Sequence, residues 1–388
     1  MSAPLRILAI VNLPWDARLG ASRVWMELAE EWTRAGHVVE KFCLTDAFPR
    51  ESRSSVISTL RTALFPRRAA AFLRENAARF DVVDCLIGTL PFAKRELRFR
   101  GLFVARSVGL FRFYDDFLLA AEKRWPEKSQ GTFLGGIFHR TLELRFRANS
   151  NRALAVCDLL NLPNEDERVA LAADPSIHAP AVVEPYGLND RFRVALGDAA
   201  APAPARLRAG KICFIGVWSY RKGSRDWPRL LETIWRAKPQ TEFLFLGTMF
   251  EEATVRAELG VADARRITCL PKYPAAQLPA LLADCTLALF PSYIEGFGLA
   301  VIEQLAAGLP TIAYDVPGPR QILPANLRTP IGEPEKMAER ALEILSLPLA
   351  EYEALAAECR ALAGRYRWDE IAASTIEKYR AALASLGQ

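Results

Sequence analysis

The chain of 388 residues is long enough for two domains, and about half of its residues are hydrophobic, so it can build two sizeable cores. No apolar run approaches the roughly 20 residues of a membrane-spanning helix, and the apolar stretch 7–11 is too short for a signal peptide. The seven cysteines are scattered without Cys-x-x-Cys spacing, which argues against disulfides and a zinc site, so we expect a cytoplasmic protein.

The net charge of +5 is distributed unevenly along the chain. Residues 1–150 hold 24 Lys and Arg against 16 Asp and Glu, a balance of +8. Within them, the stretch 54–80 is typical of one or two helices and carries arginines among large apolar side chains: Arg61, Arg67, Arg68, Arg74 and Arg79 beside Leu60, Leu64, Phe65 and Phe72. Such a face fits an anionic membrane or an anionic acceptor, and a solvated helical face explains it equally well. Nucleic acid is not expected as a partner, because no nucleic-acid-binding motif accompanies the charge.

Strands and helices alternate along the first half of the chain. The expected strands are 6–11, 38–44, 81–86, 102–106, 153–157 and 180–183, and the expected helices include 22–35 and 136–148. A loop that ends in Gly20, Ala21 and Ser22 leads into the first of these helices. We therefore expect residues 1–193 to form one Rossmann-like α/β domain.

The segment 194–210 is rich in Ala and Pro and has no periodicity, so we expect it to be a linker to a second domain, 211–388. The expected strands of this domain are 211–215, 242–246, 266–269, 286–290 and 311–314, and its helices include 226–237, 275–283, 335–347 and about 368–386. Strand 286–290 is mostly apolar, as in a central parallel strand buried on both faces. Sheets of this kind bind ligands beyond the carboxyl ends of their strands.

The most informative stretch follows strand 286–290 and has the sequence PSYIEGFGLAVIEQLAAGLPTIAY, residues 291–314. It places Glu295 before a Gly-Phe-Gly turn and Glu303 about two helical turns into the helix that follows. A glycine-lined turn at a helix N-terminus offers free N–H groups and the positive end of the helix dipole, which suits a diphosphate. Two acids beside such a site are best explained if they bind hydroxyl groups of the ligand, as in a sugar and a ribose. An ordinary strand-to-helix junction with solvated glutamates is the alternative for either acid alone.

The stretch resembles the Glu-x7-Glu signature of the retaining glycosyltransferases of family 4. Weaker matches accompany it: the first strand, glycine loop and helix ending in Ala35-Gly36-His37, the segment 184–188, and Gly216 followed by Lys222-Gly223. The resemblance implies a GT-B fold, in which two Rossmann-like, doubly wound parallel-sheet domains face each other across a cleft. It also implies that the terminal helix, about 368–386, crosses back to the N-terminal domain.

The resemblance further implies roles for individual residues. Glu303 would accept hydrogen bonds from a ribose, and Glu295 would bind hydroxyls of the transferred sugar. Lys222 would hold the diphosphate, and Val217 occupies the position of the family's arginine, so we expect Arg221 to supply the missing charge. Glu295, Lys222 and Arg221 are thus the catalytic candidates. The other donor-binding candidates are Gly216, Gly296, Phe297, Gly298 and Leu299, with Lys272 and Tyr273 near the nucleobase.

In the first domain, the candidates for an acceptor and phosphate loop are Gly20, Ala21, Ser22, Arg106 and Ser107. The family often carries a histidine after the fourth strand, where this chain has Val108, and we expect Arg106 and Ser107 to take over its polar role. No metal site and no cofactor are expected, since the nucleotide sugar is a substrate.

The resulting hypothesis is a cytoplasmic, retaining, metal-independent glycosyltransferase that works at the inner face of the membrane. It would move a sugar from a UDP- or GDP-linked donor to a glycan or lipid-linked acceptor, for cell-surface polysaccharide or glycolipid. The departures at Val217 and Val108 leave open a catalytically weak nucleotide-sugar-binding subunit. A GT-B phosphorylase is disfavoured, because the chain is short and lacks a lysine motif for pyridoxal phosphate.

Overall fold

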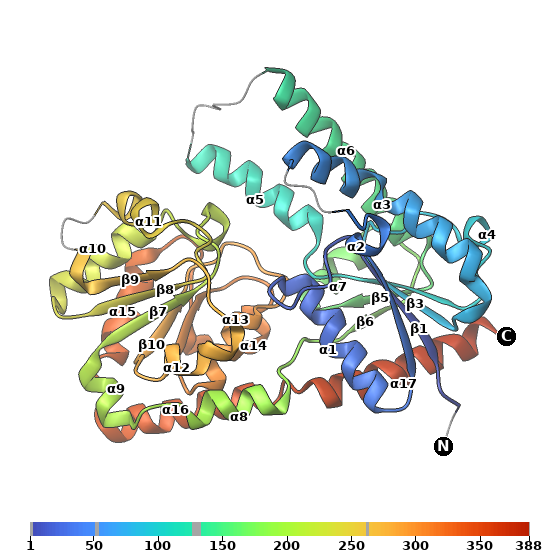
Figure 1. The fold of residues 1–388 in the computed structure, drawn as a ribbon. Coiled ribbons are helices and arrows are strands. Elements are labelled where there is room, and N and C mark those ends of the chain that lie inside the picture. The colour runs from blue at the N-terminus through green and yellow to red at the C-terminus, as the bar shows by residue number, and fades with distance from the viewer. Residues whose placement is uncertain (1–2, 51–53, 126–132, 261–263, 388) are drawn as a thin grey trace. The chain divides into compact units, whose positions relative to one another are not determined.

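A computed structural model describes residues 3–50, 54–125, 133–260 and 264–387. The chain divides into two compact units (Figure 1). Unit 1 comprises Met1–Asp115, Glu122–Tyr186 and Trp368–Gln388, and unit 2 comprises Asp116–Ala121 and Gly187–Arg367. After Tyr186 the chain stays in unit 2 until Arg367 and then returns to unit 1 for its last helix. No helix in the described part of the chain is both long and apolar enough to cross a membrane.

Unit 1 is built on a six-stranded parallel sheet in the order β2-β1-β3-β4-β5-β6. Its strands are β1 Arg6–Val11, β2 Val38–Cys43, β3 Val82–Leu86, β4 Leu102–Arg106, β5 Leu159–Leu162 and β6 Ala181–Val183. Its helices are α1 Gly20–Arg34, α2 Leu44–Ala47, α3 Ser55–Asn76, α4 Lys94–Leu97, α6 Phe133–Val156, α7 Glu165–Ala172 and α17 Trp368–Leu386, and α5 Phe111–Arg124 is shared between the two units. Strands β3, β4 and β5 are almost completely buried, as expected for parallel strands covered on both faces.

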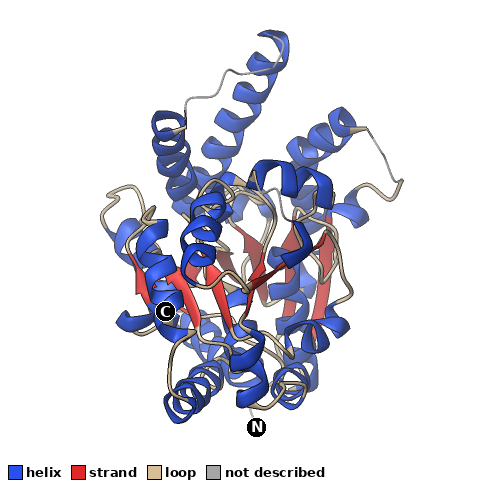
Figure 2. Ribbon diagram, turned by 90° about the vertical axis from the view of Figure 1, so that its left-hand side faces the viewer, coloured by secondary structure: helices blue, strands red, loops and turns tan. Residues whose placement is uncertain are grey.

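Unit 2 repeats the architecture with the strand order β12-β11-β10-β7-β8-β9, again parallel. Its strands are β7 Lys211–Ile215, β8 Glu242–Leu246, β9 Ile267–Leu270, β10 Leu287–Phe290, β11 Thr311–Tyr314 and β12 Arg328–Thr329. Its helices are α8 Asp190–Asp198, α9 Ala203–Ala209, α10 Trp227–Ala237, α11 Glu252–Leu259, α12 Leu278–Leu282, α13 Leu299–Ala306, α14 Pro319–Ile322, α15 Pro334–Ile344 and α16 Leu349–Ala363. Helices lie on both sides of the strands (Figure 2). The predicted fold of two doubly wound parallel α/β units is confirmed.

Two local predictions differ from the structure. Residues 153–156 do not form a strand but end helix α6, and the strand lies later, at β5. A short apolar run fits a buried helix turn as well as a buried strand, so its pattern cannot separate the two. The expected linker 194–210 holds the end of α8 and the whole of α9, because buried Leu196 and Arg206 tie it to unit 2.

The last helix, α17, packs along α1 in unit 1 (Figure 1). The Trp32 indole N–H donates to the carbonyl of Ala372 at 3.2 Å, and the buried Tyr379 hydroxyl lies 2.9 Å from Nη2 of Arg106. These polar contacts are buried, so they fix the position of α17 on unit 1 as well as stabilise it.

Candidate active site

The glycine turn after β10 has the geometry that the sequence predicts. Gly298 is the residue before α13 and has φ +104°, a conformation that favours glycine. Gly318 has φ +84°, and a Cβ there would lie 2.3 Å from the carbonyl oxygen of Phe297. Glycine at 318 therefore lets the segment before α14 touch the turn itself. The turn lies at the carboxyl edge of the sheet, where parallel sheets bind ligands.

The loop after β7 packs directly against this turn. Gly223 has φ +79°, and a Cβ on it would lie 2.2 Å from the carbonyl oxygen of Pro291, so only glycine allows this approach. The N–H of Tyr293 donates to the carbonyl of Arg221 at 2.8 Å. β7 and β10 are neighbours in the sheet, and their loops therefore meet although they lie about seventy residues apart in sequence.

This packing brings together three of the predicted site residues. Lys222 Nζ donates to Oε1 of Glu295 in an ion pair, and Nη1 of Arg221 lies 3.7 Å from the same oxygen. The lysine ammonium also lies 4.7 Å from the ring centroid of Phe290, a cation–π distance. The Lys222 side chain is 13% exposed and that of Glu295 10%, so water screens the pair only partly.

The environment of Lys222 lowers the pKa of its ammonium below the ordinary value. Burial is the largest cause, and nearby Arg221 acts in the same direction, while the carboxylate of Glu295 opposes both. The charge of Lys222 thus depends on the acid beside it.

Glu303 lies in the second turn of α13 and is 6% exposed. The turn residues Gly296, Phe297 and Gly298 are buried, and Leu299 is half-buried at the start of α13. Glu295 and Glu303 therefore flank the same turn, one on each side of it along the chain. The ribose role of Glu303 stays a prediction.

The loops after β7, β8 and β9 lie side by side at the same edge. The N–H of Gly216 donates to Leu246 and that of Trp218 to Thr248, both at 2.9 Å. Val217, in place of the family's arginine, is 41% exposed between them. A Cβ on Gly247 would lie 3.5 Å from the Tyr273 ring, so the ring packs over that glycine; Lys272 is exposed.

Asp226 is a residue of this region that the sequence interpretation missed. Its Oδ2 accepts hydrogen bonds from the hydroxyls of Tyr293 and Tyr314, both at 2.7 Å. It thereby ties the start of α10 to the turn after β10 and to β11. Nothing in the sequence pairs an aspartate with tyrosines 67 and 88 residues away.

In unit 1, the structure changes the prediction for Arg106. Its side chain is completely buried and donates to both oxygens of Asp84, to Asn161 at 3.0 Å and to Tyr379 at 2.9 Å. Burial is the largest single influence and lowers the pKa of Arg106, but the Asp84 carboxylate together with Tyr379 and Tyr186 outweighs it, and the net shift is upward. A guanidinium enclosed in this way holds the core together, so we replace its expected ligand-binding role with a structural one.

The other candidates of unit 1 also make local contacts. Gly20 begins α1, followed by Ala21 and then Ser22, whose buried hydroxyl donates to the carbonyl of Pro14 at 2.6 Å. The Ser107 hydroxyl accepts from the N–H of Gly109 at 3.0 Å, and its side chain is 1% exposed. Both serine hydroxyls thus shape the loops that carry them.

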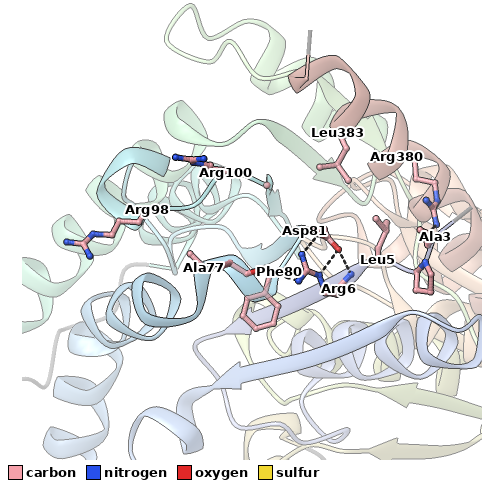
Figure 3. A pocket seen from close by; sticks show the side chains of 13 residues that line it. Ala3, Leu5, Arg6, Ala77, Phe80, Asp81, Arg98, Arg100, Arg380 and Leu383 are labelled. Carbon is pink, nitrogen blue, oxygen red and sulfur yellow. Dashed lines mark hydrogen bonds and ion pairs between the residues drawn. The ribbon is translucent and has the colours of Figure 1, made fainter.

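A hollow of about 850 Å³ lies elsewhere in unit 1, at the amino ends of β1, β3 and β4 and beside α17 (Figure 3). Arg6 and Asp81 pair in its wall, with Nη2 and Oδ1 2.7 Å apart. The labelled Arg98 and Arg100 point away from this pair in Figure 3. Ligands of doubly wound sheets bind at the opposite edge, so we assign this hollow no part in the site.

Among the described residues no cluster of three or more His, Cys, Asp or Glu could hold a metal ion.

Comparison with known proteins addresses the chemistry of unit 2. Residues 202–361 match the model of the family "Glycosyl transferases group 1", a range that includes Lys222, Glu295 and Glu303. The matched range lies entirely within unit 2. This match supports the predicted membership among glycosyltransferases, whereas family 4 and its Glu-x7-Glu motif stay predictions.

Curated relatives extend the similarity beyond unit 2. The chain is 28% identical over 329 residues, 80% of each chain, to GDP-mannose:cellobiosyl-diphosphopolyprenol alpha-mannosyltransferase of Xanthomonas campestris. It is 31% identical over 186 residues to D-inositol 3-phosphate glycosyltransferase of Segniliparus rotundus, which covers 44% of this chain and 40% of the relative.

Solved structures share the fold of the whole chain. A sucrose-phosphate synthase from Thermosynechococcus elongatus has a TM-score of 0.73 at 19% identity, over 98% of this chain and all of that one. Anabaena HepE, in complex with UDP and glucose, has a TM-score of 0.68 at 15% identity, over 97% of this chain and all of that one. At such identities the likeness concerns the fold alone.

Changing Glu295 to Gln should move the alkaline limit of sugar transfer to lower pH. The carboxylate favours charged Lys222 and the neutral amide does not, so the pKa of Lys222 should fall further. Rates measured against pH, with whichever donor the wild type uses, check this. The control is Lys222→Arg, whose guanidinium keeps its proton and should remove the alkaline fall. An unchanged alkaline limb in Glu295→Gln would show that the two charges are not coupled in the reaction.

Proposed function

We propose that this protein is a retaining glycosyltransferase that moves a sugar from a UDP- or GDP-linked donor to a glycan or lipid-linked acceptor. The observation that carries the proposal is the convergence of Lys222, Arg221 and Glu295 beside the glycine turn of α13. This arrangement lies inside the region that matches the glycosyl transferase family. The relative from Xanthomonas, named for GDP-mannose and a diphosphopolyprenol acceptor, favours a lipid-linked acceptor and a role in cell-surface polysaccharide or glycolipid synthesis.

The proposed reaction needs positive charge at the departing diphosphate. The bond between the anomeric carbon and the phosphate oxygen breaks, and the acceptor oxygen bonds to that carbon on the same face. The departing phosphate oxygen takes the acceptor proton, so no enzyme nucleophile is required. Lys222, Arg221 and the N-terminus of α13 stabilise the charge that develops on the phosphate. Glu295 binds hydroxyls of the sugar, and Glu303 binds the ribose.

A second candidate function is a nucleotide-sugar-binding subunit with little activity of its own. It is favoured by Val217, which is exposed where the family carries an arginine. Arg221 near Glu295 supplies a guanidinium from the same loop, and for this reason we prefer the enzyme.

Changing Glu303 to Ala should weaken nucleoside diphosphate binding about 10- to 150-fold, because a hydrogen bond to a charged group contributes about 1.5–3 kcal/mol. Calorimetry with UDP, GDP and ADP identifies the nucleotide and measures the loss. Exposed Glu339→Ala in α15 is the matched control. The loss should disappear with the 2′,3′-dideoxy form of the same nucleotide. Equal losses for the ribose and dideoxyribose forms would refute the ribose assignment.

We also propose that α3 docks unit 1 on an anionic membrane, where a lipid-linked acceptor would lie. The N-terminal half of α3 exposes four large apolar side chains, at spacings that place them along one side of the helix: Val56, Ile57, Leu60 and Leu64, each between 43% and 56% exposed. Exposed Arg67 and Arg68 follow them on the same helix. Apolar side chains beside arginines are typical of helices that lie in a bilayer interface.

Reversing the charge of Arg67 and Arg68 to Glu should lower binding to phosphatidylglycerol vesicles at least tenfold, since each basic residue contributes about 1 kcal/mol at such a surface. Binding should also fall steeply with salt. Cosedimentation measures both effects. The matched control reverses exposed Arg208 and Arg365 in unit 2, an equal change of net charge, and should retain binding. Equal losses in the two double variants would mean that α3 is not the docking surface.

A further inference from the structure

Arg206, in helix α9, is a buried cation at the far end of the helix that begins at the proposed site. Its side chain is 2% exposed and donates three hydrogen bonds to backbone carbonyls. Nε donates to Cys285 at 2.7 Å, Nη1 to Ala307 at 3.2 Å and Nη2 to Gly308 at 3.0 Å. One guanidinium thus joins the residues just before β10 to the residues just after α13, the two elements that flank the glycine turn.

Within the part of the chain that the structure describes, the partners of the Arg206 guanidinium are backbone carbonyls and not carboxylates. The ring of Tyr352 lies 5.9 Å from its guanidinium carbon. The last carbonyls of a helix have no partner within the helix and carry its negative dipole end. Ala307 and Gly308 supply two such carbonyls for α13, so Arg206 is compensated by the C-terminal end of that helix.

A positive charge that offsets the negative dipole end of α13 also raises the electrostatic potential at the N-terminal end of that helix. Eight helical residues span about 12 Å, so the guanidinium lies roughly 15 Å from an anion at the N-terminal turn. Water screens surface charges over such a distance, but the guanidinium is buried and the helix lies between. Unit charges about 15 Å apart, at an effective dielectric of about 20, change affinity roughly sixfold for each ligand charge.

We infer that Arg206 is a positioning residue for the donor diphosphate: from the C-terminal end of α13 it adds positive potential at the N-terminal turn of that helix. The inference rests on the proposed function, because it assumes a diphosphate at that turn. A purely structural role predicts something different. Loss of packing would lower the affinity of unit 2 for every ligand by the same factor. Loss of a buried charge would instead reduce the binding free energy of each ligand in proportion to that ligand's charge.

The experiment compares two variants: Arg206→Met, which keeps the apolar stem, and Arg206→Lys, which keeps the charge. For each, calorimetry measures the affinity for the nucleoside, its monophosphate and its diphosphate, with the base that the wild type binds best. In Arg206→Met the nucleoside should bind as in the wild type and the diphosphate at least tenfold more weakly, with the monophosphate between them. Arg206→Lys should keep most of the wild-type ratio between diphosphate and nucleoside.

Each outcome decides a separate point. Equal losses for all three ligands in Arg206→Met would overturn the electrostatic role. If that variant does not fold, a folded Arg206→Lys that loses the preference for the diphosphate would overturn it as well. A wild-type protein that binds no nucleoside diphosphate would instead remove the proposed function, and this result is visible before any variant is made.

Discussion

The ion pair between Lys222 and Glu295 is the interaction on which the candidate site depends. Two parallel strands that neighbour each other end at the same edge, and Gly223 allows their loops to touch at Pro291. A lysine and a glutamate about seventy residues apart are thereby brought into one partly desolvated pair. Such a pair is sensitive to the loss of either partner, because the remaining charge stays buried. In the proposed function, donor binding and the charge state of the site are therefore linked through the same two side chains.

Buried charge serves different purposes in the two units. Arg106 of unit 1 is enclosed by Asp84, Asn161 and Tyr379, and this cluster holds the last helix on the first sheet. Arg206 of unit 2 has carbonyls as partners and compensates a helix end. Lys222, near Phe290, keeps part of its surface exposed at the edge of the sheet. Exposure and the nature of the partner, rather than residue type, separate these two buried cations from the candidate for catalysis.

Much of the fold could be predicted from the sequence, because the apolar run 286–290 is followed by the glycine turn 296–298 and then by a helix, the order of a strand-to-helix junction in a parallel sheet. The segment 153–157 was predicted wrongly as a strand, since four or five apolar residues fit helix and strand alike. From the sequence alone, Arg106 is a candidate for binding a ligand, and only the structure shows that it is buried beside Asp84. The contacts of Asp226 with Tyr293 and Tyr314 depend on packing over long sequence distances, which no local pattern encodes.

The most direct test of the account is a transfer assay that also reads stereochemistry. The protein is incubated with UDP- and GDP-sugars and a polyprenol-diphosphate-sugar extract, and nuclear magnetic resonance follows the anomeric signals of donor and product. The account predicts that nucleoside diphosphate is released, that the new linkage keeps the donor's configuration, and that Lys222→Ala with Arg221→Ala slows transfer more than it weakens donor binding. A product of inverted configuration, or a donor that binds but is never transferred, would contradict it.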